Sequence, residues 1–136
     1  MVKISDEELS FITGSDDIET AKDMLLQGRT KCVIYTMGKD GSAVYTEKYS
    51  VFVKGYKVEA VDTTGAGDSF IGAMEYQLLR DGVRSLDDLT QQKLEEYLRF
   101  ANAYAAFTTT RKGALSSLAS KKEIEEWLKK PEFHPN

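Results

Sequence analysis

The chain has 136 residues and a hydrophobic content of 41%, which suits one modest soluble domain with its own core. Its 22 acidic and 18 basic residues are mixed along the sequence, and no basic stripe indicates binding to nucleic acid. No apolar run is long enough to cross a membrane, and the first residues lack the apolar core of a signal peptide.

The sulfur and imidazole side chains are too few for disulfide or zinc chemistry. Cys32 is the single cysteine, so an internal disulfide is impossible and a reducing, cytoplasmic setting is expected. Cys32 falls in an apolar run, which predicts a small core residue. The single histidine, His134, lies in the C-terminal tail with no cysteine nearby, so no zinc site is expected.

The first third of the chain predicts two helices followed by a strand. Ser5 and Glu8 have the spacing of a capping box, which predicts a short helix that ends at Gly14. Apolar residues at helical spacing predict a second helix from residue 16 or 17 to residue 28. The continuous apolar run Cys32–Tyr35 predicts a buried strand, and such a run is typical of a parallel strand covered on both faces.

The middle of the chain predicts a turn and short strands. Gly38-Lys39-Asp40-Gly41 has the composition of a turn. The segments Ser42–Thr46 and Val51–Val53 predict two shorter strands that are joined near Lys48. The segment Tyr56–Val61 alternates polar and apolar residues, which predicts a further strand leading into a glycine-rich loop.

The rest of the chain predicts helices separated by short loops. Apolar residues recur at helical spacing in three segments, and these predict helices over residues 69–79, 89–109 and 120–130. Lys112-Gly113 interrupts the pattern between the last two helices. We find neither repeats nor a linker, so we expect residues 1–136 to form a single α/β domain.

The junction between the last predicted strand and its helix carries the most informative residues, Gly65, Ala66, Gly67 and Asp68. Glycine lets a backbone approach a ligand closely, and the first turn of a helix offers unpaired N–H groups and partial positive charge. Such a turn binds anions, most often phosphate. A carboxylate at this position would repel a phosphate unless it takes part in the chemistry. The alternative is that Asp68 only caps the helix.

Two better-known phosphate motifs do not fit this junction. A Walker loop requires a lysine directly after its last glycine, whereas Asp68 follows Gly67. A dinucleotide fingerprint requires a third glycine three residues after Gly67, and Phe70 stands there. Phosphoryl transfer is therefore favoured over hydride transfer.

The run Asp62-Thr63-Thr64-Gly65-Ala66-Gly67-Asp68 resembles the C-terminal motif of the PfkB, or ribokinase-like, family of carbohydrate kinases. In that family the motif reads Asp-Thr-x-Gly-Ala-Gly-Asp and precedes a helix. The resemblance implies that Asp68 is the base that deprotonates the sugar hydroxyl. It also implies that the amides of Gly65, Ala66, Gly67 and Asp68 hold the transferring phosphoryl group.

Two further segments resemble the family's nucleotide site. Thr36, Gly38 and Gly41 match its Thr-x-Gly-x-x-Gly motif, which implies that they and Gly67 bind ATP. Asn102 matches a position near the adenine. The alternatives are a plain hairpin turn for residues 36–41 and close helix packing for Asn102.

The resemblance also implies two metal sites. Ser5 and Glu8 replace the family's Asn-x-x-Glu motif, whose Glu organises Mg²⁺ indirectly, although a capping box alone explains both residues. A potassium or similar monovalent cation is implied near a loop that otherwise only connects helices, where Leu118 stands near a position that is often Pro. The matching positions are Asp62, Thr64, Thr108, Arg111, Gly113 and Ser117.

The resemblance covers the chain from Ile4 to Leu128 and implies the C-terminal half of a ribokinase-like fold, with a mostly parallel, Rossmann-like sheet flanked by helices. It implies ATP-dependent phosphorylation of a sugar hydroxyl, with a fructokinase-like acceptor, although ribokinase, ketodeoxygluconate kinase and nucleoside kinases share these motifs. Family members are roughly twice this length. The alternative is a non-catalytic nucleotide-binding or interaction fragment that forms a homodimer or pairs with a missing N-terminal half.

Overall fold

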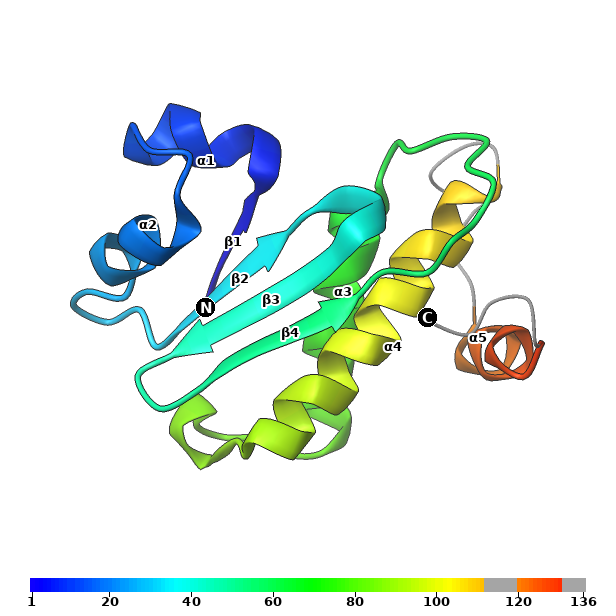
Figure 1. The fold of residues 1–136 in the computed structure, drawn as a ribbon. Helices are drawn as coiled ribbons and strands as arrows, with labels where there is room; N and C mark the ends of the chain where they lie inside the picture. The colour runs from blue at the N-terminus through cyan, green and yellow to red at the C-terminus, as the bar shows by residue number, and fades with distance from the viewer. Residues whose placement is uncertain (112–119, 131–136) are drawn as a thin grey trace.

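Residues 1–111 and 120–130 are described by a computed structural model, in which a four-stranded sheet has helices packed on both faces (Figure 1). Two short 3-10 helices, η1 and η2, accompany the regular elements. In chain order the elements are β1 (Val2–Ser5), α1 (Asp6–Thr13), α2 (Ile18–Leu25), β2 (Cys32–Thr36), η1 (Gly38–Asp40), β3 (Gly41–Thr46), β4 (Ser50–Lys54), α3 (Ala66–Arg80), η2 (Leu86–Asp88), α4 (Gln91–Thr109) and α5 (Lys121–Leu128).

The strands follow one another across the sheet in the order β1-β2-β3-β4. β1 and β2 are parallel, with Ser5 opposite Thr36, so both strands end at the same edge. β3 pairs antiparallel with β2 and with β4, because short connections join these strands as hairpins. The α/β class is confirmed, whereas parallel pairing is confined to β1 and β2 among the described strands.

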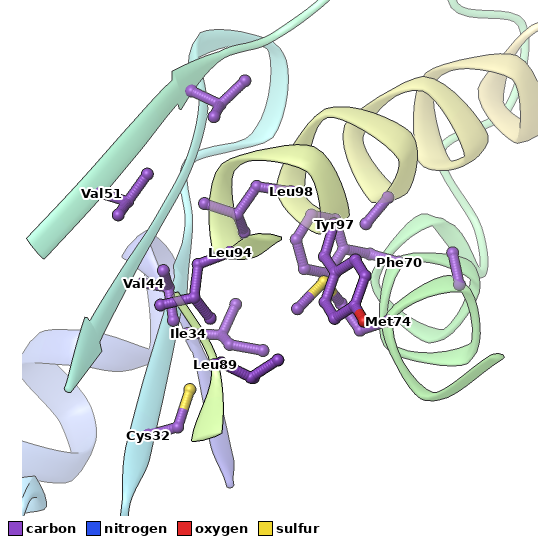
Figure 2. Packing of buried hydrophobic residues seen from close by; sticks show 13 residues of the cluster. Cys32, Ile34, Val44, Val51, Phe70, Met74, Leu89, Leu94, Tyr97 and Leu98 are labelled. Atoms are coloured by element: carbon purple, nitrogen blue, oxygen red, sulfur yellow. The ribbon is translucent and has the colours of Figure 1, made fainter. Parts of the chain in front are cut away.

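The sheet separates two cores because side chains alternate along each strand. Val33 of β2 belongs to the core under α1 and α2, and its neighbours Cys32 and Ile34 belong to the larger core under α3 and α4. β2 is thus covered on both faces, as predicted. Figure 2 shows the larger core, in which helix residues meet the strand residues Ile34, Val44 and Val51; the helix residues include Phe70, Met74, Leu94, Tyr97 and Leu98.

The helix boundaries confirm the predicted capping signals. Ser5 caps α1 in a complete capping box with Glu8, and the helix ends at Gly14 in the left-handed conformation, with φ 70°. Asp17 caps α2 by accepting hydrogen bonds from the backbone of Glu19 and Thr20. A second capping box, built on Ser120, begins α5.

Two strand assignments differ from the prediction. The segment Tyr56–Val61 is not a strand. Its alternation arises because Tyr56 and Val58 pack against a cluster of α4 and α5 side chains, while the amide of Val61 donates to the carbonyl of Thr109 at 2.7 Å. Strand β1 was not predicted, because its four residues are too few to show a reliable period.

Candidate functional site

A cleft of about 630 Å³ opens where β1 and β2 end, beside the N-terminus of α3. Its walls come from five parts of the chain: β1 and the start of α1, the end of β2 with the following turn, the segment after β4, the start of α3, and α4. The predicted site residues among its lining are Thr36, Gly38, Gly41, Ala66, Gly67 and Asn102. The fold therefore gathers predicted site residues that are up to 66 positions apart, from 36 to 102, around one cleft.

The N-terminus of α3 is the part of this cleft best suited to an anion. Gly65 takes the N-cap position in the left-handed conformation, with φ 79°, and no side chain caps the helix. The amide of Ala66 donates to the carbonyl of Thr63 at 3.2 Å. Among the described residues, no hydrogen-bond acceptor is recorded for the amides of Gly67 and Asp68. These two amides remain available to a phosphate oxygen.

Asp68 stands in the first turn of α3, directly after Gly67, and its side chain is exposed. A carboxylate is stabilised at this end of a helix by the partial positive charge of the backbone. The described residues provide no recorded hydrogen bond to the Asp68 side chain, so it does not act as the helix cap. Asp68 does not line the cleft itself, but it directly follows Gly67, which does.

The turn after β2 needs glycine for packing as well as for any ligand. Gly41 has φ 122°, and a Cβ atom built there would lie 2.1 Å from the carbonyl oxygen of Val53. A Cβ atom on Gly55 would lie 2.3 Å from the carbonyl oxygen of Lys39. Gly41 and Gly55 therefore let the turn lie directly against the end of β4, and Gly55 also lines the cleft. By contrast, a Cβ atom on Gly38 would meet nothing within 4 Å.

Asn102 lines the cleft from α4, but its side chain is already used by the protein. Its amide nitrogen donates to the carbonyl of Val53 at 3.2 Å, and its amide oxygen accepts from Ser42 Oγ at 2.8 Å. The residue is buried, with 7% of its surface exposed. Its hydrogen bonds tie α4 to β3 and β4, so its first effect is to fix the wall of the cleft.

Glu8 is also engaged, because it completes the capping box of α1. Its Oε2 atom accepts from the amide of Ser5 at 2.8 Å and lies 3.7 Å from Lys3 Nζ. The hydrogen bonds to Ser5 and the charge of Lys3 hold the pKa of Glu8 below its usual value. Two other carboxylates of the first turn of α1, Asp6 and Glu7, line the cleft, whereas Glu8 does not.

The described residues among those predicted for a monovalent cation lie in two segments that meet at the C-terminal end of α4. The amides of Val61 and Asp62 donate to the carbonyl of Thr109 at 2.7 and 3.0 Å. The guanidinium of Arg111 lies 3.4 Å from the carboxylate of Glu123 and stacks over a phenylalanine ring. The remaining described positions are Thr64, whose amide donates to Asp62, and buried Thr108; Gly113 and Ser117 lie outside the described residues.

Sequence reasoning missed several residues that line the cleft, among them Lys3 and Gly55. Gly55 directly follows β4, and its position between a strand and an alternating segment was the available signal. Lys3 was not recognised as a cleft residue because the strand that contains it, β1, was not predicted. Within residues 1–111 and 120–130, no group of three or more histidine, cysteine, aspartate and glutamate side chains is placed to hold a metal ion.

The free Cys32 is buried, and burial raises the pKa of its thiol to about 11, which fits a core residue rather than a nucleophile. None of the helices that the structure describes combines the length and apolar character needed to span a membrane.

The glycine-rich junction and the cleft together place an uncapped helix N-terminus, suited to an anion, at the edge of an α/β sheet. The model of the pfkB family carbohydrate kinases matches residues 1–122. The chain belongs to the pfkB family of carbohydrate kinases.

Plant fructokinases are among its relatives. The chain is 44% identical over 131 residues to the probable fructokinase-4 of Arabidopsis thaliana. The match covers 95% of this chain and 39% of the relative. The chain is also 44% identical over 125 residues to fructokinase-1 of Oryza sativa subsp. japonica, covering 91% of this chain and 38% of the relative. The chain thus spans about two fifths of the length of these curated relatives.

Solved kinases confirm the ribokinase-like fold. The fructokinase of Xylella fastidiosa with bound ATP superposes with a TM-score of 0.83 at 27% identity, over 93% of this chain and 42% of that one. The fructokinase of Vibrio cholerae O395 in its fructose, ADP and calcium ion bound form gives a TM-score of 0.81 at 33% identity, over 94% of this chain and 41% of that one.

Proposed function

We propose that this chain supplies the ATP site, the anion-binding helix end and the catalytic base for phosphorylation of a sugar hydroxyl, with fructose as the acceptor. The observation that carries the proposal is the convergence of the turn 36–41 and the uncapped N-terminus of α3 on one cleft of about 630 Å³. Backbone amides are common ligands of nucleotide phosphates, and the N-terminus of α3 supplies such amides. The plant fructokinases among the relatives support the choice of sugar.

In the proposed reaction Asp68 accepts the proton of the sugar hydroxyl. The hydroxyl oxygen then forms a bond to the γ-phosphorus of ATP, and the bond from that phosphorus to the bridging oxygen of ADP breaks. The amides of Gly67 and Asp68, which have no recorded acceptor among the described residues, stabilise the negative charge on the transferring phosphoryl oxygens. Asp68 is exposed beside these amides, so a sugar could reach it from solvent or from a further part of the protein.

Magnesium fits the carboxylates at the start of α1. Asp6 and Glu7 line the cleft and Glu8 adjoins them, but no three such side chains among the described residues are placed to hold a metal ion directly, so these carboxylates would act on the waters of a Mg²⁺ ion that the phosphates hold. When bound, Mg²⁺ neutralises charge on the phosphates. Asp62, Thr64, Thr108 and Arg111, with Gly113 and Ser117, remain our proposed surroundings for potassium. The ribokinase- and fructokinase-type neighbours support both ions, because solved forms hold ATP with Mg²⁺ and, separately, fructose with ADP and a potassium ion.

A second candidate function is a nucleotide-binding or interaction fragment that requires a partner. The observation in its favour is the exposure of large apolar side chains: Phe11 is 92% exposed and Leu79 is 82% exposed. Such residues suit contact with a second copy or with a separate N-terminal half. Gel filtration with light scattering would distinguish a monomer from an assembly. The free thiol of Cys32 supports a cytoplasmic setting for either function.

The test of the nucleotide site is calorimetry of MgATP binding, with and without potassium. Gly67→Val should weaken binding by at least about tenfold, since a side chain there occupies the space in which the backbone meets a phosphate. Gly72→Val is the matched control, because it places the same side chain in the same helix at an exposed position away from the cleft. Equal affinities of the two variants, or no binding by the folded parent chain, would contradict the nucleotide site.

A further inference from the structure

Lys3 is placed on the face of the sheet that α3 and α4 cover, where a lysine is unexpected. In β1 it lies opposite Ile34 of β2, and Ile34 belongs to the core under α3 and α4. The next residue, Ile4, belongs to the other core, under α1 and α2. Because side chains alternate along a strand, Lys3 points toward α3 and α4. Only 23% of its side chain is exposed.

The ammonium group of Lys3 reaches the N-terminus of α3. A Cβ atom built on Gly67 would lie 3.2 Å from Lys3 Nζ and 3.8 Å from its Cε atom. This end of a helix carries partial positive charge, so the lysine and the helix present charges of the same sign to one another. Without a ligand that arrangement is unfavourable, and an anion between the two groups would reverse the sign of the interaction.

Glu8 compensates Lys3 only in part. The recorded ion pair has an N–O distance of 3.7 Å, and half of the Glu8 side chain is exposed, so the attraction is screened by solvent. The Glu8 carboxylate also accepts the hydrogen bond from the amide of Ser5 that completes the capping box. Glu8 therefore keeps a partner when Lys3 turns toward an anion in the cleft.

We propose that Lys3 binds the terminal phosphate of the nucleotide at the N-terminus of α3 and makes the site selective for triphosphates over monophosphates. The proposal rests on the proposed function, and it adds a residue that the glycine-rich motif does not contain. Lys3 Nζ lies at Gly67, immediately before the proposed base, which is where the transferring phosphate must lie. During transfer Lys3 acts only through its charge and hydrogen bonds.

The experiment measures the affinity of the chain for MgATP and for AMP by calorimetry, in the parent and in three variants. Lys3→Met should weaken MgATP binding by about 10- to 100-fold, the effect of losing one charge-assisted hydrogen bond, and should leave AMP binding unchanged. Lys3→Arg should restore most of the MgATP affinity. Lys31→Met removes the same charge at a half-exposed lysine outside the cleft and should match the parent.

The outcomes separate this proposal from the proposed function. If the parent binds MgATP and Lys3→Met binds it equally well, the role of Lys3 is wrong and the nucleotide site stands. An equal loss of ATP and AMP affinity would show that Lys3 only supports the fold, which also overturns its role. If the parent binds neither nucleotide, both proposals fall. Thermal melting without nucleotide checks each fold, and Lys3→Gln replaces Lys3→Met if the latter does not fold.

Discussion

The two ends of α3 are completed in opposite ways. At the C-terminal end, Asp81 accepts hydrogen bonds from Arg80 Nε and Tyr97 Oη, both at 2.7 Å, and from Lys93 Nζ at 3.4 Å. At the N-terminal end, Gly65 provides no side-chain cap, and the amides of Gly67 and Asp68 have no recorded acceptor among the described residues. We call these the closed end and the open end of the helix.

The difference between the two ends distinguishes residues that stabilise the fold from residues that are available to a ligand. A carboxylate at the C-terminus of a helix is repelled by the backbone, so Asp81 is tolerated there only with its cationic partners. A carboxylate in the first turn is attracted by the backbone, so Asp68 needs no partner and stays exposed. Unused polar groups that gather at one end of a helix, beside a cleft, are what an anion-binding site requires.

The largest effect should come from removing the acid at the open end. In a form of the protein that turns over ATP and sugar, Asp68→Asn should lower turnover by about 10²- to 10⁴-fold, because it removes the general base, and should spare MgATP affinity. Sugar-dependent release of ADP measures the turnover. Asp81→Asn is the matched control at the closed end, where turnover should be retained. Near-normal turnover of Asp68→Asn would show that Asp68, at the open end, is not the catalytic base.

A second test asks whether the glycines beside the cleft are there for packing or for a ligand. Gly41→Ala should lower the free energy of unfolding by about 3 kcal/mol, because its Cβ atom would clash with the backbone at Val53. Gly38→Ala should cost only about 1 kcal/mol, since its φ of 52° is strained for alanine but its surroundings are open. Urea unfolding measures both. Equal costs would show that the close approach of the turn to β4 does not limit stability.

Much of the fold could be predicted because its signals are local. The capping box at Ser5, the helix end at Gly14 and the start of the last helix at Ser120 are each encoded over a few residues, and the structure confirms each of them. The segment Tyr56–Val61 shows the limit, because alternation reports which side chains are buried and not what buries them. Here side chains of α4 and α5 bury Tyr56 and partly cover Val58, so a strand pattern arises without a strand.

The candidate site was predictable only where one segment carries the whole motif. The run from Gly65 to Asp68 contains its own helix start, so its geometry follows from sequence. Lys3 depends on the pairing of β1 with β2 and on the position of α3, which no local pattern encodes. Asn102 was predicted as a ligand residue, and whether it contacts a nucleotide stays a prediction. Its hydrogen bonds to β3 and β4 show a packing role that the sequence did not reveal.

The smallest effect we predict is the acid sensitivity of the closed end. Hydrogen bonds from Arg80 and then Tyr97 hold the pKa of Asp81 well below its usual value. A carboxyl group whose pKa is lowered by folding stabilises the folded state fully above its unfolded pKa of about 4, and this contribution disappears as the pH falls toward the folded pKa. The difference in unfolding free energy between the parent chain and Asp81→Asn should therefore shrink between pH 5 and about pH 2.

Urea unfolding at successive pH values measures this difference directly. Glu8, Asp17 and Glu123 also have lowered pKa values, so the parent chain alone would lose stability in acid for several reasons. Those carboxyl groups are present in Asp81→Asn as well, and subtraction removes their contribution. The partners Arg80 and Lys93 stay protonated throughout this range, and Glu96, which pairs with Lys93 at 3.3 Å and with Arg80 at 3.9 Å, is present in both proteins. A difference that stays constant with pH would mean that the closed end is held by packing around Tyr97 rather than by its charges.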